Sequence, residues 1–361
     1  MTFPPDTARA WVDIDLSALV ANARTIADTC GTRLLPMVKA NGYGLGAVRV
    51  AQALEAVDPW GYGVATVEEG AALRAAAIQR SILVFSPLSH DSMESMLEHG
   101  FRPAIGDPDM LSRWTARSDH PFHLEIDTGM ARAGIRWDDR RGLQAAAQTL
   151  ARAGGWEGVF THFHSADSDP DSVAMQWHRF QTVVRLLPRR PPLVHAANSA
   201  AALCGRAYAG DLVRPGIFLY GGTAGASSRA PKSVAALRAR VVAVRMVAAG
   251  ESVSYGATWC APAPTTVATL GIGYADGLPR AADRARDAPR LVELRGRTVP
   301  LIGRVTMDLC MAAVDDGQVA VGDVATIFGG IVSLDQQAKA AGTISYELLT
   351  ALGSRVPRLY Q

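Results

Sequence analysis

Lys39 is the residue whose surroundings point most strongly to chemistry. It closes a short apolar run, and glycines follow it at positions 42, 44 and 46. Glycines let a backbone or a ligand approach closely, and a lysine amine withdrawn from water has a lowered pKa and can form an imine. We therefore predict that Lys39 lies at the mouth of a strand, within reach of a carbonyl cofactor. On position alone, a surface lysine at a strand end is the commoner case.

Two later segments have the residue types that bind a phosphate. Asn198 or Ser199 would suit the N-cap of a short Ala-rich helix, where free amides and a hydroxyl bind anions. Arg214 and Gly216 follow the next apolar run. Each segment alone is a weak signal, but the loops after the last two strands are the usual phosphate site of a parallel barrel.

Short apolar runs alternate with amphipathic stretches from about residue 34 to 217, which predicts a (β/α)8 barrel with its chemistry at the carboxyl ends of the strands. Two of the expected helices are Thr66–Ala77, where Thr66 and Glu69 have the spacing of a capping box, and Asp138–Ala153. The expected strands are Leu34–Lys39, Gly61–Ala65, Ile82–Phe85, Arg102–Ile105, Phe122–Asp127, Gly158–His162, Leu193–Ala196 and Leu212–Gly216.

The character of the chain changes after Gly221–Ser228, which is typical of a linker or exposed turn. The later runs are bounded by Gly, Pro and Asp and predict strands near Leu237–Val247, Thr266–Gly271, Val299–Ile302 and Val324–Phe328, with a closing helix at Ser345–Leu352. We therefore predict an α/β fold with an N-terminal barrel over residues 1–228 and a C-terminal, mostly β domain over residues 229–361. The first 10 to 15 residues are expected to pack on the β domain.

The composition limits the possible partners. A chain of 361 residues with 48% hydrophobic residues can bury a core for two domains, and a net charge of +2 gives no reason to expect nucleic acid or an anionic membrane. The four cysteines have no metal-like spacing, which predicts no metal site and a reduced compartment. Because the first 15 residues lack an apolar signal segment, we expect a cytoplasmic protein.

A series of short motifs resembles the alanine racemases, which are fold-type III enzymes that use pyridoxal 5'-phosphate (PLP). The motifs occur in family order over nearly the whole chain: Val38-Lys39-Ala40-Asn41, Asp127-Thr128-Gly129-Met130, Thr161-His162-Phe163, Ala197-Asn198-Ser199, Arg214-Pro215-Gly216, Val253-Ser254-Tyr255-Gly256, Gly273-Tyr274-Ala275-Asp276-Gly277, Gly303-Arg304, Met307-Asp308 and Ser345-Tyr346-Glu347. The resemblance implies a homodimer that interconverts L- and D-alanine and supplies D-alanine for peptidoglycan.

The resemblance also implies a role for each matched residue. Lys39 would hold PLP covalently and act as one base, and Tyr255 of the other subunit would be the second. Arg214 would face the pyridine nitrogen, and Asn198 and His195 would line the site. The residues expected to bind the cofactor are Lys39, Tyr43, His162, Asn198, Ser199, Arg214, Gly216, Ile217 and Tyr346. Those expected to bind the substrate are Arg132 and, across the subunit interface, Met307 and Tyr274, with Arg280, Arg304, Asp167 and Ile344 around the entrance.

Two positions depart from the family pattern. Family members commonly carry a carbamylated lysine where this chain has Glu125, and its negative charge holds a neighbouring arginine. Our hypothesis is that Glu125 anchors Arg132 in its place, directly or through water, although an unrelated barrel role is an alternative. His164 stands where a small residue is usual, and it could face either the entrance or solvent.

Other functions remain open at this point. A serine or broad-specificity racemase of the same fold is the nearest alternative, and Tyr346 and Ile344 favour a methyl side chain by narrowing the pocket. A non-catalytic PLP-binding protein would lack the second domain and Tyr255. A metal-assisted aldolase would need ligands in the second domain, yet no histidine follows His195. A decarboxylase would use a cysteine donor, for which Cys260 or Cys310 is available.

Overall fold

All eight runs predicted as barrel strands form parallel strands in the computed structural model, which describes residues 7–225, 229–280, 290–314 and 318–361. The sheet runs in the order β2-β10-β9-β8-β6-β5-β4-β3, and a parallel bridge between Met37 and Gly63 joins its two ends. The predicted barrel is therefore confirmed. Its strands are β2 (Arg33–Leu34), β3 (Gly61–Val64), β4 (Ser81–Pro87), β5 (Arg102–Ile105), β6 (Phe122–Asp127), β8 (Trp156–Phe160), β9 (Leu193–His195) and β10 (Leu212–Val213), with β7 (Ile135–Arg136) paired to β6.

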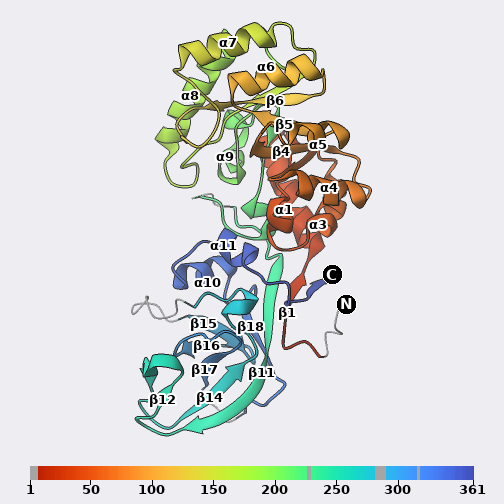
Figure 1. Cartoon of the computed structure of the whole chain (residues 1–361). Helices are drawn as coiled ribbons and strands as arrows, with labels where there is room; N and C mark the ends of the chain where they lie inside the picture. Colours follow the sequence, from red (N-terminus) through yellow and green to blue (C-terminus); the bar gives the residue numbers. More distant parts are fainter. Residues whose placement is uncertain (1–6, 226–228, 281–289, 315–317) are drawn as a thin grey trace.

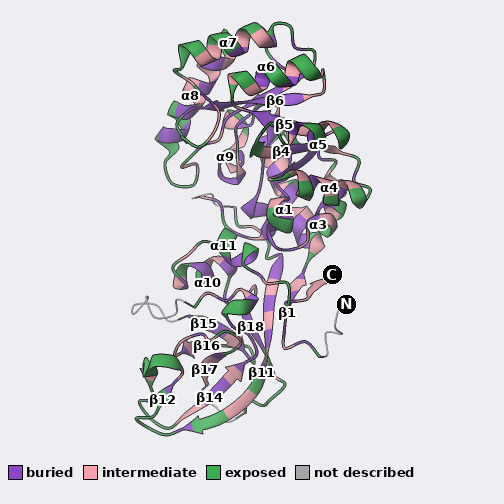
Figure 2. Cartoon of the chain, viewed as in Figure 1, coloured by how far each residue is buried: buried purple, intermediate pink, exposed green. Residues whose placement is uncertain are grey.

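Helices cover the outside of the barrel, and their solvent faces carry the exposed residues (Figure 2). They are α1 (Leu16–Cys30), α3 (Ala47–Leu54), α4 (Val67–Ala75), α5 (Met93–Glu98), α6 (Pro108–Arg117), α7 (Arg140–Leu150), α8 (Pro170–Leu186) and α9 (Ser199–Leu203), with short 3-10 turns η1 (Glu55–Val57), η2 (Gly205–Tyr208) and η3 (Ile217–Tyr220). The segment α2 (Lys39–Tyr43) is a left-handed turn rather than a regular helix. None of the helices described is long and apolar enough to cross a membrane.

Local capping explains where two predicted helices begin. Helix α7 starts later than expected because Asp139 is its N-cap and accepts the amide of Gly142 at 3.1 Å. Thr66 caps α4 by accepting the amide of Glu69. The second half of the predicted capping box is wrong, because the Glu69 carboxylate bonds the amides of Ala65 and Ala40 instead.

The C-terminal domain is built on one long strand, β11 (Ala235–Val247), which pairs with β14, β18 and β1 (Figure 1). The predicted strands and the closing helix are present as β11, β14, β16, β18 and α11. The elements that follow β11 in this domain are β12 (Ser252–Val253), η4 (Tyr255–Ala257), β13 (Trp259–Cys260), β14 (Thr265–Leu270), η5 (Tyr274–Asp276), β15 (Leu291–Leu294), β16 (Arg297–Ile302), β17 (Cys310–Val314), β18 (Val324–Phe328), α10 (Leu334–Ala340) and α11 (Ser345–Thr350).

Both ends of the chain join the sheet of the β domain. Strand β1 (Ala10–Ile14) pairs antiparallel with β11 and parallel with β19 (Arg358–Tyr360). From β1 onward the chain therefore leaves the β domain, forms the barrel and returns, so that β1 and β19 lie side by side. The linker predicted at 221–228 lies partly outside the described residues, and the boundary between 228 and 229 stays a prediction.

Candidate active site

One cavity of about 570 Å³ lies at the carboxyl ends of the barrel strands and gathers most of the predicted cofactor residues. Because these residues follow different strands, the barrel closure is what brings them together. Helix α11 of the β domain also supplies Tyr346, so both domains line the cavity. The predicted residues in the lining are Lys39, Tyr43, Arg132, His162, Asn198, Ser199, Arg214, Gly216 and Tyr346, and Glu125 joins them.

Lys39 presents its amine from the end of the first barrel segment. Burial lowers the pKa of this amine, and the positive charges of Arg132 and Arg214 lower it further, while the charge of Glu69 opposes them. The neutral amine is therefore more available near neutral pH than that of a surface lysine. This is the form that attacks a carbonyl carbon or accepts a proton.

Hydroxyl groups cluster at one end of the cavity. The ring of Tyr43 stacks on Tyr220 with centroids 4.4 Å apart, and the Ser199 hydroxyl accepts the amide of Gly216 at 2.8 Å. A Cβ on Gly216 would lie 2.2 Å from the Tyr43 hydroxyl, so glycine is required there. Burial raises the pKa of Tyr43, and it raises that of Tyr346 to about 12. These hydroxyls keep their protons and can donate to a phosphate.

Two of the predicted cofactor residues act differently from the others. Asn198 serves as the N-cap of α9, where its side chain accepts the amide of Ala201 at 3.1 Å. The side chain of Ile217 is 1% exposed and does not line the cavity, so this residue could contribute only its backbone.

Arg214 also lines the cavity and is 4% exposed. Its Nη2 donates to the carbonyls of Thr161 at 2.7 Å and Ala196 at 3.0 Å and lies 3.2 Å from His162 Nδ1. Its Nη1 lies 2.8 Å from His195 Nδ1. Its Nε has no partner among the described residues. Burial lowers the pKa of Arg214 to about 9, so the guanidinium is charged at neutral pH.

A buried chain of side chains extends from Arg214 through the barrel. Because a guanidinium only donates, His195 must accept at Nδ1 and donate from Nε2 to His123 Nδ1, 2.8 Å away. His123 then donates from Nε2 to Glu157 at 3.2 Å, and Glu157 also pairs with Arg102 at 2.6 Å. His195 was predicted to line the site, but it lies behind Arg214 and does not line the cavity. His123 and Glu157 were not predicted from the sequence.

The environment of the chain keeps both histidines neutral. Burial lowers the pKa of His123 and, with the charge of Arg214, that of His195. Burial alone would raise the pKa of Glu157, but its hydrogen bonds to His123 and Arg102 outweigh this effect and lower the pKa to about 2. Polar residues within two otherwise apolar strands, β6 and β8, were the signal that could have revealed the chain.

Glu125 is a buried carboxyl group in the cavity wall, 5% exposed. Burial raises its pKa, while the charges of Arg132 and Arg214 favour the carboxylate. No direct hydrogen bond joins it to Arg132 in the described structure. The loop that carries Arg132 is instead fixed by Asp127, which accepts the amides of Gly129 and Ala131 at 2.9 and 3.1 Å.

Three predicted site residues lie outside this cavity, on loops of the β domain. Tyr255 is 68% exposed, Met307 53% and Tyr274 41%. They therefore do not join the cavity of their own chain. The same holds for four residues predicted at the entrance, Arg280, Arg304, Asp167 and Ile344. His164 is exposed, and its Nδ1 lies 2.7 Å from the hydroxyl oxygen of Ser165.

Comparison with known proteins identifies the family of this chain. The family models "Alanine racemase, N-terminal domain" and "Alanine racemase, C-terminal domain" match residues 14–224 and 234–360. The chain belongs to the alanine racemase family. The alanine racemase of Deinococcus deserti is 39% identical over 361 residues, covering 98% of this chain and 99% of that protein. That of Geobacillus kaustophilus is 35% identical, covering 97% and 94%.

Solved alanine racemases have the same arrangement of both domains. The crystal structure from E. faecalis has a TM-score of 0.90 at 31% identity and covers 100% of both chains. An alanine racemase from Bartonella henselae, described as having covalently bound pyridoxal phosphate, has a TM-score of 0.90 at 30% identity and covers 98% of this chain and 100% of that one. The family and fold predicted from the sequence motifs are confirmed.

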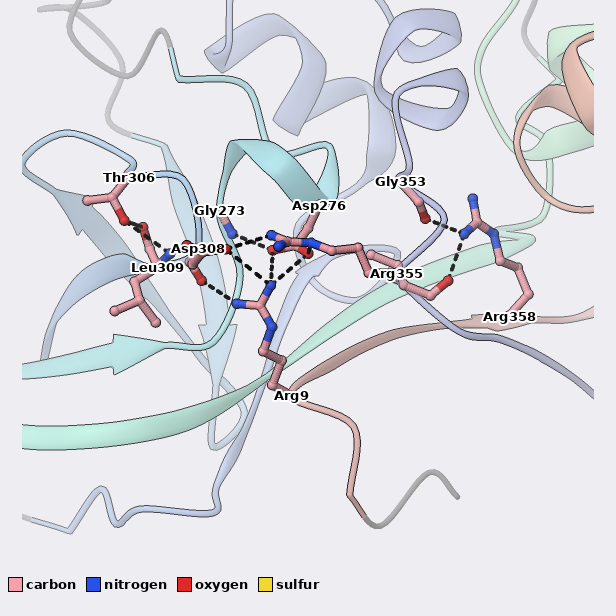
Figure 3. Close-up of polar contacts among 10 residues, drawn as sticks. Arg9, Gly273, Asp276, Thr306, Asp308, Leu309, Gly353, Arg355 and Arg358 are labelled. Carbon is pink, nitrogen blue, oxygen red and sulfur yellow. Dashed lines mark hydrogen bonds and ion pairs between the residues drawn. The ribbon is translucent and has the colours of Figure 1, made fainter. Parts of the chain in front are cut away.

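Ion pairs hold the exposed loops of this alanine racemase family member in place (Figure 3). Asp276, whose side chain is 2% exposed, pairs with Arg9 and Arg355, each at 2.9 Å. Arg355 also pairs with Asp308 at 2.8 Å, and Arg9 donates to the carbonyl of Asp308 at 2.7 Å. Tyr274 lies two residues before Asp276 in the sequence, and Met307 directly precedes Asp308. The network therefore fixes the loops that present both side chains to solvent.

Proposed function

We propose that this protein is a PLP-dependent enzyme that interconverts L- and D-alanine with two bases, Lys39 of one subunit and Tyr255 of the other. Family membership supports the reaction and the substrate, and it implies a role in supplying D-alanine for the cell wall. The observation that carries the proposal is the half-buried Lys39 amine, whose pKa is lowered, in the same cavity as Arg214.

The cavity lining fits PLP in three respects. Lys39 can hold an aldehyde covalently, and the hydroxyls of Tyr43, Ser199 and Tyr346, beside Gly216, suit a phosphate. Arg214 leaves its Nε free to donate a hydrogen bond toward a ring nitrogen. Bound PLP supplies an electron sink for the pair that remains when the Cα–H bond of the substrate breaks.

Arg214 would control whether the ring nitrogen of the cofactor is protonated. A guanidinium that is fixed by the carbonyls of Thr161 and Ala196 donates a hydrogen bond but does not readily transfer a proton. It would therefore leave the ring nitrogen unprotonated, which weakens the electron sink. We infer that this disfavours side reactions such as transamination while leaving proton exchange at Cα to the two bases.

Racemisation requires one base on each face of the substrate. Lys39 can accept the α-proton on one face once the substrate amine has replaced it on the cofactor. His162, Tyr43 and Tyr346 suit this task poorly, because burial and neighbouring cations lower the pKa of His162 to about 3, and burial raises the pKa of both tyrosines. These properties support a second base that comes from outside the chain's own cavity.

Tyr255 is our candidate for that base. It lies on a loop of the β domain and exposes 68% of its surface, as expected of a side chain that a second subunit would cover. Because interfaces of homodimers are self-complementary, one contact can place both copies of Tyr255 in both cavities. Tyr274 and Met307 would enter with it, and Arg132 would orient the carboxylate of the substrate.

Glu125 is proposed to take over the anchoring of Arg132. It supplies a buried negative charge in the same cavity, although its carboxylate makes no direct bond to Arg132, so a water between them would complete the contact. The substitution would remove any need for carbon dioxide to modify a lysine at this position.

Specificity for alanine over serine is the finer part of the proposal. Tyr346 lines the cavity and limits the space for a larger side chain, whereas Ile344 is 61% exposed and lies outside the lining, so its effect would depend on the dimer. A non-catalytic PLP-binding protein is the alternative of another class. It would have no use for the ordered loops of the β domain. A cytoplasmic location stays a prediction.

A direct assay separates these possibilities. The purified protein should bind PLP covalently, seen as cofactor absorbance that stays with the protein after borohydride reduction and is absent in Lys39→Ala. It should convert L-alanine to D-alanine faster than it converts serine or larger amino acids. PLP binding without racemisation would favour the non-catalytic alternative, and equal rates with serine would favour a broad-specificity racemase.

A further inference from the structure

The backbone directly after Lys39 follows a left-handed turn. Five consecutive residues have positive φ: Ala40 at 52°, Asn41 at 53°, Gly42 at 63°, Tyr43 at 52° and Gly44 at 80°. In this conformation the Cβ of an L-residue crowds the backbone, so only glycine adopts it freely. Three residues of this turn are not glycine. Such a segment persists only where its surroundings hold it.

The carboxylate of Glu69 holds the start of this turn. Its Oε1 accepts the amide of Ala40 at 2.6 Å, and its Oε2 accepts the amide of Ala65 at 2.7 Å. Ala40 follows Lys39 directly, and Ala65 follows strand β3. One carboxylate therefore ties the peptide beside the lysine to the end of the neighbouring barrel strand, through two short, charge-assisted hydrogen bonds.

The far end of the turn has separate supports. Arg358 donates from Nε to the carbonyl of Gly44 at 3.0 Å, and the Tyr360 hydroxyl donates to the carbonyl of Leu45 at 2.9 Å. Both come from strand β19 of the β domain. These contacts fix where the turn ends, whereas Glu69 fixes the peptide from which the Lys39 side chain departs.

We propose that Glu69 is a positioning residue for Lys39, because its carboxylate holds the left-handed turn that aims the lysine amine into the cavity. The assignment rests on the proposed role of Lys39 as the lysine that holds PLP. Glu69 also places a negative charge near the amine, which limits how far burial lowers the pKa of Lys39. The contact and the charge act together on one side chain.

Hydrogen exchange and cofactor capture in the full-length protein test this proposal. Glu69→Ala frees both amides, so deuterium uptake of the peptide covering residues 38–46 should rise about tenfold in rate, and borohydride-trapped PLP should form about tenfold more slowly. Glu69→Gln keeps one neutral acceptor and should lie between wild type and Glu69→Ala. The uptake measurement does not depend on bound cofactor.

Glu68→Ala is the matched control. Glu68 is the exposed neighbour of Glu69 in the first turn of α4, and in the described structure its carboxylate makes no hydrogen bond or ion pair with residues 38–46. It should stay within about twofold of the wild type in both measurements. Wild-type uptake over residues 38–46 in Glu69→Ala, or the same change in Glu68→Ala, would overturn the proposal.

The same two measurements also separate a folding failure and a failure of the proposed function from a failure of the positioning role. If Glu69→Ala does not fold, Glu69→Gln decides by the same comparison with Glu68→Ala. If wild type captures no PLP at Lys39, the proposed function fails, and so does the role of Glu69 in it. If wild type captures PLP and both Glu69 variants match it in uptake and capture, the positioning role alone is wrong.

Discussion

The barrel cavity is lined by residues of one chain, whereas three predicted site residues on loops of the β domain lie outside the cavity of their own chain. The barrel side of the cavity includes buried side chains that bond to one another, as with the four polar contacts of Arg214. The loops expose Tyr255, Tyr274 and Met307, although ion pairs to the buried Asp276 hold two of these loops rigidly. Rigid loops that present apolar side chains to solvent are built to meet another surface. In the proposed dimer, each chain would contribute two different half-sites.

The largest expected effect removes the cavity's own base. Lys39→Ala should lower the rate of D-alanine formation by about 10⁴-fold or more, because both covalent attachment and one proton transfer are lost. Initial rates and borohydride-trapped PLP measure the two losses separately. The exposed Lys232→Ala is the control and should match the wild type. Racemisation by Lys39→Ala above about 1% of the wild-type rate would contradict the role of the cavity.

Removing the hydroxyl of Tyr255, the proposed base on the loop, should affect catalysis and not the capture of PLP. Tyr255→Phe should lower the rate of racemisation about 10³-fold while leaving PLP capture unchanged, because its hydroxyl is exposed in its own chain. Exchange of the α-proton with solvent should persist for one enantiomer, the one whose proton faces Lys39. If exchange of both enantiomers fell equally, or if neither changed, Tyr255 would not be the second base.

Glu125→Gln tests the charge behind Arg132. Activity near neutral pH should fall about tenfold, mainly through a higher KM, because Arg132 loses a buried charge partner. Since burial raises the pKa of Glu125, the wild-type enzyme should lose activity on acidification at a higher pH than an ordinary carboxyl group would give. The variant should lack that step in its pH–rate profile. Unchanged kinetics and an unchanged profile would show that Glu125 has no part in substrate binding.

The smallest effect concerns the ion pairs behind the loops. Arg355→Ala should reduce racemisation about fivefold with little change in PLP capture, because Asp276 and Asp308 lose a shared partner and the loops of Tyr274 and Met307 loosen. Arg136→Ala is a suitable control, since it removes an exposed pair with Asp138 in the barrel domain. A loss of PLP capture equal to the loss of activity would place the effect in the fold and not in the loops.

Local patterns predicted the barrel and part of its cavity, and the resemblance of the motifs to the alanine racemases implied the rest. Each strand is a short apolar run bounded by turn residues, and the functional residues follow strand ends, where a barrel gathers them. Longer-range contacts had no such signal. His123 and Glu157 find partners on neighbouring strands, and Arg9 bonds Asp276 at a separation of 267 residues. Glu69 fitted the local capping-box pattern, but its carboxylate instead bonds Ala40, a contact that exists only after β3 and Lys39 are adjacent.

Complementation between two inactive variants tests most directly whether the two half-sites meet across a dimer. Lys39→Ala and Tyr255→Phe chains, each with its own tag, would be co-expressed and the mixed dimers compared with each parent. Random mixing should restore about one quarter of the wild-type activity, because half of the dimers carry one site with both intact bases. Purified mixed dimers with no activity above the parents would contradict the account, since a site complete within one chain cannot be restored by exchange of subunits.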